Sequence, residues 1–200
     1  MRDFNHNARI TMATLLALLL GACGSSPRTN HYLLSAHEAP VPGGQTPSLG
    51  IGPIEIPQYL NRNALVYQRD GNQLQVSAQD RWAEPLGDGI QRVLAINLAG
   101  LLDTGDISYF PWHARRSPDF GVQVTVLNLD ASDRQARLVA EWLVYAGSTD
   151  TPVARRISEL RQDLPAGALS PAQIAPAYSV LLYRLSEIIA GEIRAARSAP

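Results

Sequence analysis

A short basic segment followed by an apolar run sets the start of this chain apart from the rest. Arg2 and Arg9 precede a run from Ile10 to Leu20 that only two threonines interrupt. This order is typical of a secretory signal peptide. The run is too short to cross a bilayer, because about 30 Å of hydrocarbon requires about 20 residues of helix. We therefore expect residues 1–22 to be cleaved, so that the fold is built outside the cytoplasm from the remaining residues.

The apolar run ends in the segment Leu20-Gly21-Ala22-Cys23, which contains the single cysteine of the chain. This ending resembles the lipobox of bacterial lipoprotein precursors, in which a leucine and two small residues precede the cysteine that is lipidated. One thiol cannot close an internal disulfide, so we expect Cys23 to carry a covalent diacylglycerol and acyl lipid, with no other cofactor. Because more than one acyl chain anchors stably, attachment is effectively permanent. A signal peptide that merely ends near a cysteine, or a short buried helix with a core thiol, is the alternative.

The residues after Cys23 indicate the membrane and the domain plan. Bacterial lipoproteins are commonly retained in the inner membrane when aspartate follows the cysteine, whereas Gly24 and Ser25 follow here. The resemblance therefore favours the periplasmic side of the outer membrane. Residues 23–30 are small and polar and read as a lipidated tether. Residues 31–200 are expected to form a single domain.

Composition excludes several classes of partner. The chain is 46% hydrophobic and 18% charged, with a formal net charge of -1, which suits a folded globular domain. Its basic residues form no stripe, so we expect no nucleic-acid binding.

Alternating apolar residues predict strands along the first and middle thirds of the chain. Residues 31–34 and 49–56 read as strands, and Gly52-Pro53 in the second indicates an edge strand or a bulge. A turn signal at Asp70-Gly71-Asn72 predicts a hairpin between residues 64–68 and 73–77. The two clearest strands are residues 120–126 and 136–144, joined by a tight polar turn, and residues 155–164 add a third strand.

Two amphipathic helices complete the pattern. Pro85 precedes apolar residues at steps of three and four up to Leu102, and Ser170-Pro171-Ala172-Gln173 opens a second helix with an apolar stripe to Ile193. Mixed hairpins and helices predict an α+β fold, with a mainly antiparallel sheet covered on one face by both helices. Asn97 lies towards the apolar side of the first helix, where it could hydrogen-bond a neighbouring subunit or its own loop.

The mature part of the chain lacks the residue patterns of an enzyme or a metal site. His31, His37 and His113 have no metal-ligand spacing, and no nucleophile elbow or phosphate-binding loop is present. Trp82 and Trp142 fall on predicted buried faces, so core packing is favoured over a ligand pocket. We expect no catalytic residues and no metal.

Several motifs in fixed order resemble the PqiC/YmbA family of ABC-type transport auxiliary lipoproteins. They are Gly52-Pro53-Ile54-Glu55-Ile56-Pro57, Tyr59-Leu60-Asn61-Arg62, Leu65-Val66 and Arg81-Trp82-Ala83-Glu84-Pro85-Leu86. Asn63 departs from the pattern, where proline is expected. The resemblance implies a non-enzymatic accessory subunit of an intermembrane lipid transport system. Its partner would be an MCE-domain protein of the Pqi type, docked by a ring-shaped homo-oligomer at the inner leaflet of the outer membrane.

Two short segments are candidates for binding that partner. Tyr59, Leu60 and Arg62 lie in a predicted exposed turn, where an apolar and charged cluster marks either an interface or an ordinary turn. Arg115 and Arg116, beside Trp112, could contact lipid headgroups or acidic groups of a partner, or belong to a solvated loop.

Two rival functions make different structural predictions. A lipid-carrying shuttle or chaperone lipoprotein predicts a hollow interior. A periplasmic hydrolase predicts a cleft with a nucleophile and a base within hydrogen-bond reach.

Overall fold

The computed structural model describes residues 28–38, 41–70, 72–112, 117–132, 134–147, 149, 151–165 and 169–198. Cys23, Arg115 and Arg116 lie outside these described residues. Across the described part of the chain, no helix combines the length and the apolar character needed to cross a membrane. The elements are, in order, β1 Asn30–Tyr32, β2 Leu49–Glu55, the short 3-10 helix η1 Gln58–Leu60, β3 Ala64–Asp70, β4 Gln73–Trp82, α2 Leu86–Leu102, β5 Ile107–Tyr109, β6 Phe120–Ala131, β7 Gln135–Ala146, β8 Thr151–Asp163 and α3 Pro171–Ser198.

The larger of two sheets has five strands in the order β5-β2-β6-β7-β8. Strands β6, β7 and β8 form an antiparallel meander, in which Val124 lies opposite Trp142 and Trp142 lies opposite Arg156. The predicted pairing of residues 120–126 with residues 136–144 is therefore confirmed. Strand β2 runs parallel to both of its neighbours, β5 and β6. The sheet is therefore mixed, with parallel pairing on the β5-β2-β6 side and antiparallel pairing on the β6-β7-β8 side.

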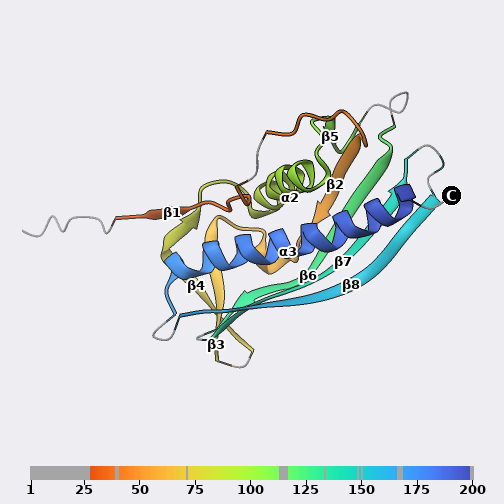
Figure 1. The fold of residues 1–200 in the computed structure, drawn as a ribbon. Helices are drawn as coiled ribbons and strands as arrows, with labels where there is room; N and C mark the ends of the chain where they lie inside the picture. The colour runs from red at the N-terminus through yellow and green to blue at the C-terminus, as the bar shows by residue number, and fades with distance from the viewer. Residues whose placement is uncertain are drawn as a thin grey trace, which may run out of the picture.

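A second, three-stranded sheet has the order β1-β4-β3. The predicted hairpin is confirmed as β3 and β4, with β4 longer than the pattern indicated, because it continues to Trp82. Strand β1 runs parallel to the last residues of β4, so that Tyr32 lies opposite Trp82. Figure 1 shows β1 and this hairpin at the end of the molecule opposite the C-terminal end of α3.

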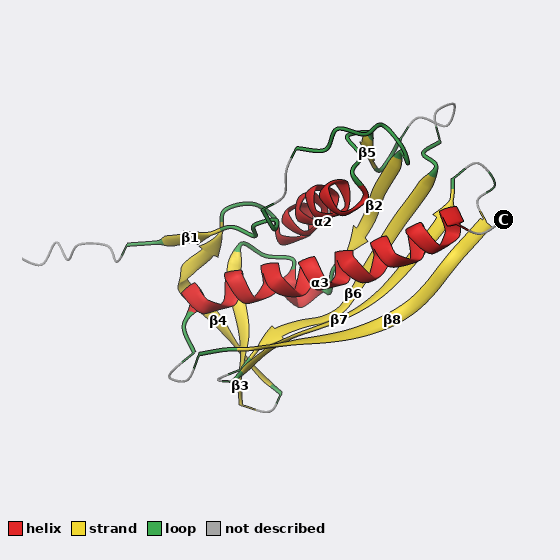
Figure 2. Cartoon of the chain, in the orientation of Figure 1, coloured by secondary structure: helices red, strands yellow, loops and turns green. Residues whose placement is uncertain are grey.

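Both long helices pack on one face of the five-stranded sheet, as the apolar stripes predicted (Figure 2). Helix α2 lies against β2, helix α3 lies against β7 and β8, and the two helices contact each other. Alternate residues of β7 are buried on the helix side, while those between them are only half-buried. This alternation is expected of an antiparallel sheet with one covered face, and the fold is α+β.

The Gly52-Pro53 pair forms a bulge in the interior of the sheet. The register between β2 and β6 shifts between Ile51 and Ile54, and Gly52 has a φ of 113°. The bulge expectation is confirmed, whereas the edge expectation is wrong, because β2 lies between β5 and β6. A bulge removes residues from the ladder, which lets an interior strand accommodate a proline that has no N–H to donate.

Large side chains fill the space between the helices and the five-stranded sheet. Trp142 and Tyr178 are each 1% exposed and Trp82 is 6% exposed. Trp82 stacks on Tyr178 with ring centroids 6.2 Å apart. Both tryptophans are therefore core residues, as predicted. This packed interior disagrees with the hollow body that the lipid-carrying rival predicted.

Candidate functional site: an apolar groove beside the N-terminal segment

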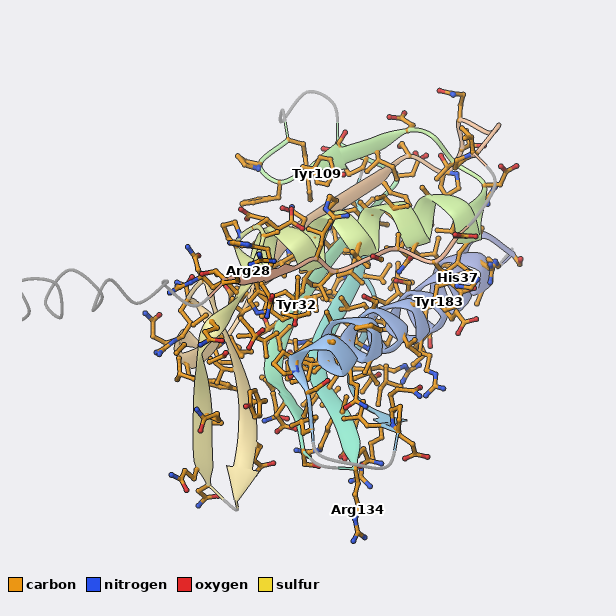
Figure 3. All side chains as sticks on the ribbon, turned by 90° about the vertical axis from the view of Figure 1, so that its left-hand side faces the viewer. Arg28, Tyr32, His37, Tyr109, Arg134 and Tyr183 are labelled. Atoms are coloured by element: carbon orange, nitrogen blue, oxygen red, sulfur yellow. The ribbon has the colours of Figure 1, made fainter. Side chains whose placement is uncertain are left out.

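A groove of about 600 Å³ lies between the N-terminal segment, residues 31–37, and the first half of α3. This volume falls within the range of about 300–1,000 Å³ that is typical of small-molecule sites. Figure 3 looks onto this end of the molecule, with Tyr32, His37 and Tyr183 labelled. The lining residues are His31, Tyr32, Leu33, Ser35, Ala36, His37, Ala172, Ala175, Pro176, Ser179, Val180 and Tyr183.

Helix α3 contributes one stripe of its surface to the groove. Ala172, Ala175, Pro176, Ser179, Val180 and Tyr183 recur at steps of three and four, so they lie on one side of the helix over three turns. The core-facing stripe, which includes Tyr178 and Leu181, is distinct from it. The sequence prediction found only the core stripe. The small residues beside the core stripe were the signal that could have indicated the groove, because larger side chains at these positions would fill it.

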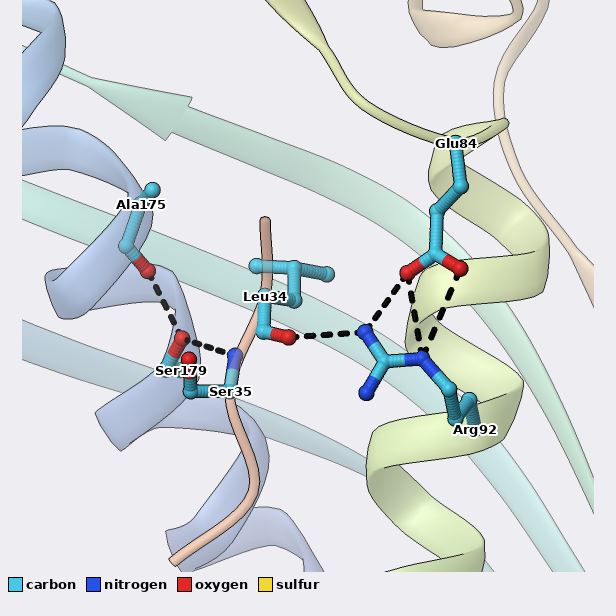
Figure 4. Close-up of polar contacts among 6 residues, drawn as sticks. All are labelled: Leu34, Ser35, Glu84, Arg92, Ala175 and Ser179. Carbon is cyan, nitrogen blue, oxygen red and sulfur yellow. Dashed lines mark hydrogen bonds and ion pairs between the residues drawn. The ribbon is translucent and has the colours of Figure 1, made fainter. Parts of the chain in front are cut away.

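Hydrogen bonds to both long helices hold the N-terminal segment in place (Figure 4). The Ser35 N–H donates to the Ser179 hydroxyl at 3.0 Å, and this hydroxyl donates to the Ala175 carbonyl at 2.8 Å. On the other side, the Arg92 guanidinium donates to the Leu34 carbonyl at 2.8 Å and pairs with the Glu84 carboxylate at 2.6 Å. The segment is thus fixed at Leu34 and Ser35, with the Leu34 side chain buried.

Two further contacts fix the far end of the segment at His37. The Asn97 carboxamide oxygen accepts a hydrogen bond from the His37 N–H at 2.9 Å. The His37 ring packs on Tyr183 with ring centroids 4.2 Å apart. Asn97 therefore bonds a loop of its own chain, which is one of the two roles that its place on the helix left open.

The walls of the groove expose apolar surface and few polar groups in need of partners. The Tyr32 hydroxyl donates to the Asp80 carboxylate at 3.2 Å, and Ser179 is already bonded. Leu33 and Val180 are 50% and 40% exposed. Among the described lining residues there is no acidic residue and no arginine. A groove of this kind favours an apolar ligand, because a charged one would lose its hydration without compensating hydrogen bonds.

Asp80 fastens β1, the start of the N-terminal segment, to β4. Its carboxylate accepts hydrogen bonds from the Asn30 carboxamide at 2.9 Å and from the Ser77 hydroxyl at 2.7 Å, besides that from Tyr32. The bonds from Asn30 and Ser77 lower the pKa of Asp80 most, and burial opposes them. Burial and the neighbouring Asp80 charge raise the pKa of Tyr32. The ionised form of Asp80 is therefore the form that the folded structure stabilises.

Replacing Asp80 by asparagine is expected to loosen β1 and lower Tm at neutral pH. Because the folded pKa of Asp80 lies below its ordinary value of 3.8, its contribution is present above that value and is lost as the pH falls through the folded pKa. The difference in Tm between wild type and Asp80→Asn should therefore shrink towards zero in acid. Thermal unfolding at a series of pH values measures it.

Glu187→Gln is the matched control for Asp80→Asn, since Glu187 is an exposed carboxylate on α3, away from the β1–β4 pair. Its difference in Tm from wild type is expected to stay within the small range of surface substitutions at every pH. A difference for Asp80→Asn that stays constant or grows in acid would contradict the role given to the carboxylate.

The predicted partner-binding turn does not present all of its side chains to solvent. Leu60 is 3% exposed and belongs to the core. Tyr59 is half-buried, and its hydroxyl oxygen accepts a hydrogen bond from the Leu129 N–H at 3.5 Å. Of these three residues, Arg62 alone is exposed. The expectation of a wholly exposed cluster is wrong for Leu60, because the 3-10 turn of η1 directs successive side chains to different sides.

Comparison with known proteins identifies the family of this chain. The model of the family described as ABC-type transport auxiliary lipoprotein component matches residues 32–190. The chain belongs to this family. The match spans the N-terminal segment, both sheets and most of α3. The family's described role is auxiliary to a transporter, which is consistent with the non-enzymatic function expected from the sequence.

Solved structures support the fold, and no curated protein matches the chain in sequence. The protein XCC0632 from Xanthomonas campestris has a TM-score of 0.66 at 14% identity, over 82% of this chain and 93% of that chain. A crystal structure described as an uncharacterized protein has a TM-score of 0.67 at 19% identity, over 84% of this chain and 99% of that one. At these identities the likeness concerns the fold alone.

Proposed function

We propose that this protein is a lipid-anchored accessory subunit of an MCE-domain transporter of the Pqi type, held on the periplasmic side of the outer membrane. The observation that carries this proposal is the family match over residues 32–190, in a chain whose Leu20-Gly21-Ala22-Cys23 segment resembles a lipobox. Its role is structural. Residues 23–30 tether a single domain, residues 31–200, to the inner leaflet, and the domain binds the transporter.

The short tether places the domain close to the membrane. Seven residue steps separate Cys23 from Asn30, the first residue of β1. At about 3.3–3.6 Å per residue, an extended chain of this length spans at most about 25 Å. The end of the domain that carries β1 and the groove therefore faces the membrane surface, and other surfaces are left for proteins.

We assign the protein-binding surfaces to residues that are not among the described lining residues of the groove. Arg62 is the exposed member of the predicted turn, and Arg115 and Arg116 follow the half-exposed aromatic residues Tyr109 and Phe110. We assign these residues to the transporter contact. Ile157, 64% exposed on the edge strand β8, is a candidate for the contact between copies in a ring-shaped homo-oligomer.

Affinity purification of the membrane-solubilised protein, followed by mass spectrometry of proteins and lipids, tests this function. We expect an MCE-domain protein and further copies of this chain to be recovered. Arg62→Glu should lower recovery of the transporter several-fold, because charge reversal opposes the electrostatic match of an interface. Arg197→Glu reverses an exposed charge at the end of α3 and serves as the control. Cys23→Ser should release the protein from the membrane fraction.

Recovery of neither an MCE-domain partner nor a second copy would reject the proposal. A monomer loaded with lipid would instead favour the shuttle.

A further inference from the structure

We propose that the groove between the N-terminal segment and α3 holds one acyl chain of the lipid on Cys23 of the same molecule. The inference rests on the lipidation of Cys23 in the proposed function and adds a second role to the anchor. One chain would lie along the protein while the remaining chains stay in the bilayer. Retaining two chains in the bilayer is sufficient for stable attachment.

The chemistry of the groove suits a hydrocarbon chain. Leu33 and Val180 expose apolar surface, and Ala172, Ala175 and Pro176 line the floor with small carbon surfaces. The Ser179 and Tyr32 hydroxyls are bonded within the protein, so neither requires a polar ligand. Relative to water, each methylene on such a surface is stabilised by about 0.8 kcal/mol, so the groove can replace the apolar surroundings that the chain has in the bilayer. An occupant without polar groups therefore gains from burial and breaks no hydrogen bond.

The length of the groove also matches one acyl chain. Its helical wall runs from Ala172 to Tyr183, eleven steps along α3, or roughly 16 Å at 1.5 Å per residue. The hydrocarbon core of a bilayer is about 30 Å thick, so one leaflet, and hence one chain, accounts for about 15 Å.

The groove begins where the tether joins the domain. Ser35 is bonded to Ser179 and His37 packs on Tyr183, so the segment advances along α3 in the direction of the helix. His31 therefore lies towards the Ala172 end, and both residues line the groove. Eight residue steps from Cys23 to His31 span at most about 29 Å. A chain on Cys23 can thus enter the groove at the end nearest its own attachment point.

Covalent attachment favours this chain over a free lipid. A group tethered by a short flexible linker has an effective concentration in the millimolar range at its site. The Cys23 lipid is held beside the groove on every molecule, whereas a free phospholipid must first diffuse to it. Occupancy by the anchor would also hold the domain in one orientation on the membrane, with α3 beside the lipid surface.

Photo-crosslinking of the full-length lipidated protein tests the inference. Cells expressing it are fed a fatty acid that carries a diazirine, and the purified protein is irradiated and digested. We expect mass spectrometry to find the Cys23 peptide joined through its acyl chain to a peptide from residues 31–37 or 172–183. Val180→Trp should lower this yield roughly tenfold, because an indole displaces about two methylene groups from the groove.

Ile188→Trp is the matched control, since Ile188 is 36% exposed on the same helix, is β-branched like Val180, and is not among the groove residues. Its yield should equal that of wild type. Leu33→Asp provides a second groove variant that leaves α3 unchanged, and it should also lower the yield. Equal Tm values for the variants and wild type confirm that each one is folded.

Two outcomes would overturn the inference. If Cys23 is lipidated and the crosslinks fall outside the groove, the anchor does not occupy it. If the groove peptides carry a phospholipid that is not joined to Cys23, the occupant is a free lipid. Either result can coexist with recovery of an MCE-domain partner, which would leave the proposed function standing. An unlipidated Cys23 would instead reject the proposed anchoring together with this inference.

Discussion

Trp142→Ala is expected to lower the free energy of unfolding by about 3–5 kcal/mol, the usual cost of removing a large aromatic side chain from a core. Trp142 is 1% exposed on the helix side of β7. Its neighbours across the sheet are Val124 on β6 and Arg156 on β8. Both pairings are regular around Trp142, so we expect little collapse of the strands around the lost volume. Denaturant unfolding followed by fluorescence or circular dichroism measures the effect.

Part of this loss of stability comes from one hydrogen bond. A second variant measures that part separately. The Trp142 indole N–H donates to the Ser158 hydroxyl at 2.9 Å. Ser158→Ala is expected to cost about 1–3 kcal/mol, because it leaves a buried donor without an acceptor. Trp142→Phe should cost less in the Ser158→Ala background than in wild type, because it then also removes a donor that Ser158→Ala has left without an acceptor. A loss for Trp142→Ala no larger than that for Ser158→Ala would show that packing contributes little here.

Gly52→Ala is expected to destabilise the protein by about 2–4 kcal/mol, from backbone strain together with steric overlap. Gly52 has a φ of 113°, a region that residues with a Cβ atom rarely adopt. An added Cβ would lie 2.7 Å from the Gln91 side-chain nitrogen and 3.0 Å from the Phe110 Cβ. That nitrogen donates to the Ile51 carbonyl at 2.8 Å, so relief of the overlap would disturb the bond that ties α2 to β2.

Gly191→Ala is the control for Gly52→Ala. Gly191 lies within α3 and an added Cβ there would meet nothing within 4 Å. Alanine is favoured over glycine inside a helix by up to about 1 kcal/mol, so this variant should be more stable than wild type. If both variants shift the unfolding midpoint in the same direction, the conformation given to Gly52 is wrong.

Local patterns predicted most of the elements in this fold. The alternation of Phe120, Val122, Val124 and Val126, and the steps of three and four after Pro85, reflect burial on one side of a strand or helix. At the predicted start of the second long helix, the Ser170 N–H donates to the Gln173 carboxamide oxygen at 3.2 Å, which is the return bond of a capping box. Such features depend on neighbours within a few residues, which is why a single sequence reveals them.

Features that depend on distant contacts could not be predicted in the same way. The interior place of β2 depends on β5 and β6, which lie more than fifty residues further along the chain. Leu60 is buried because η1 packs against the core, although its own segment has the composition of an exposed turn. The groove forms only when residues 31–37 pack beside α3. The sequence of neither segment indicates that the two are neighbours in the fold.

The parallel placement of β2 has a consequence for folding. Ser48 and Asp119, which lie 71 positions apart, exchange two hydrogen bonds at the start of the β2–β6 pairing. A chain that emerges from its N-terminus therefore exposes the apolar β2 well before its partner strand β6 arrives. Non-local pairing of this kind is slow and leaves strand edges open to other chains in the meantime. During that delay β2 remains an open strand edge, so the wait for β6 sets the period in which the folding chain is most prone to aggregate.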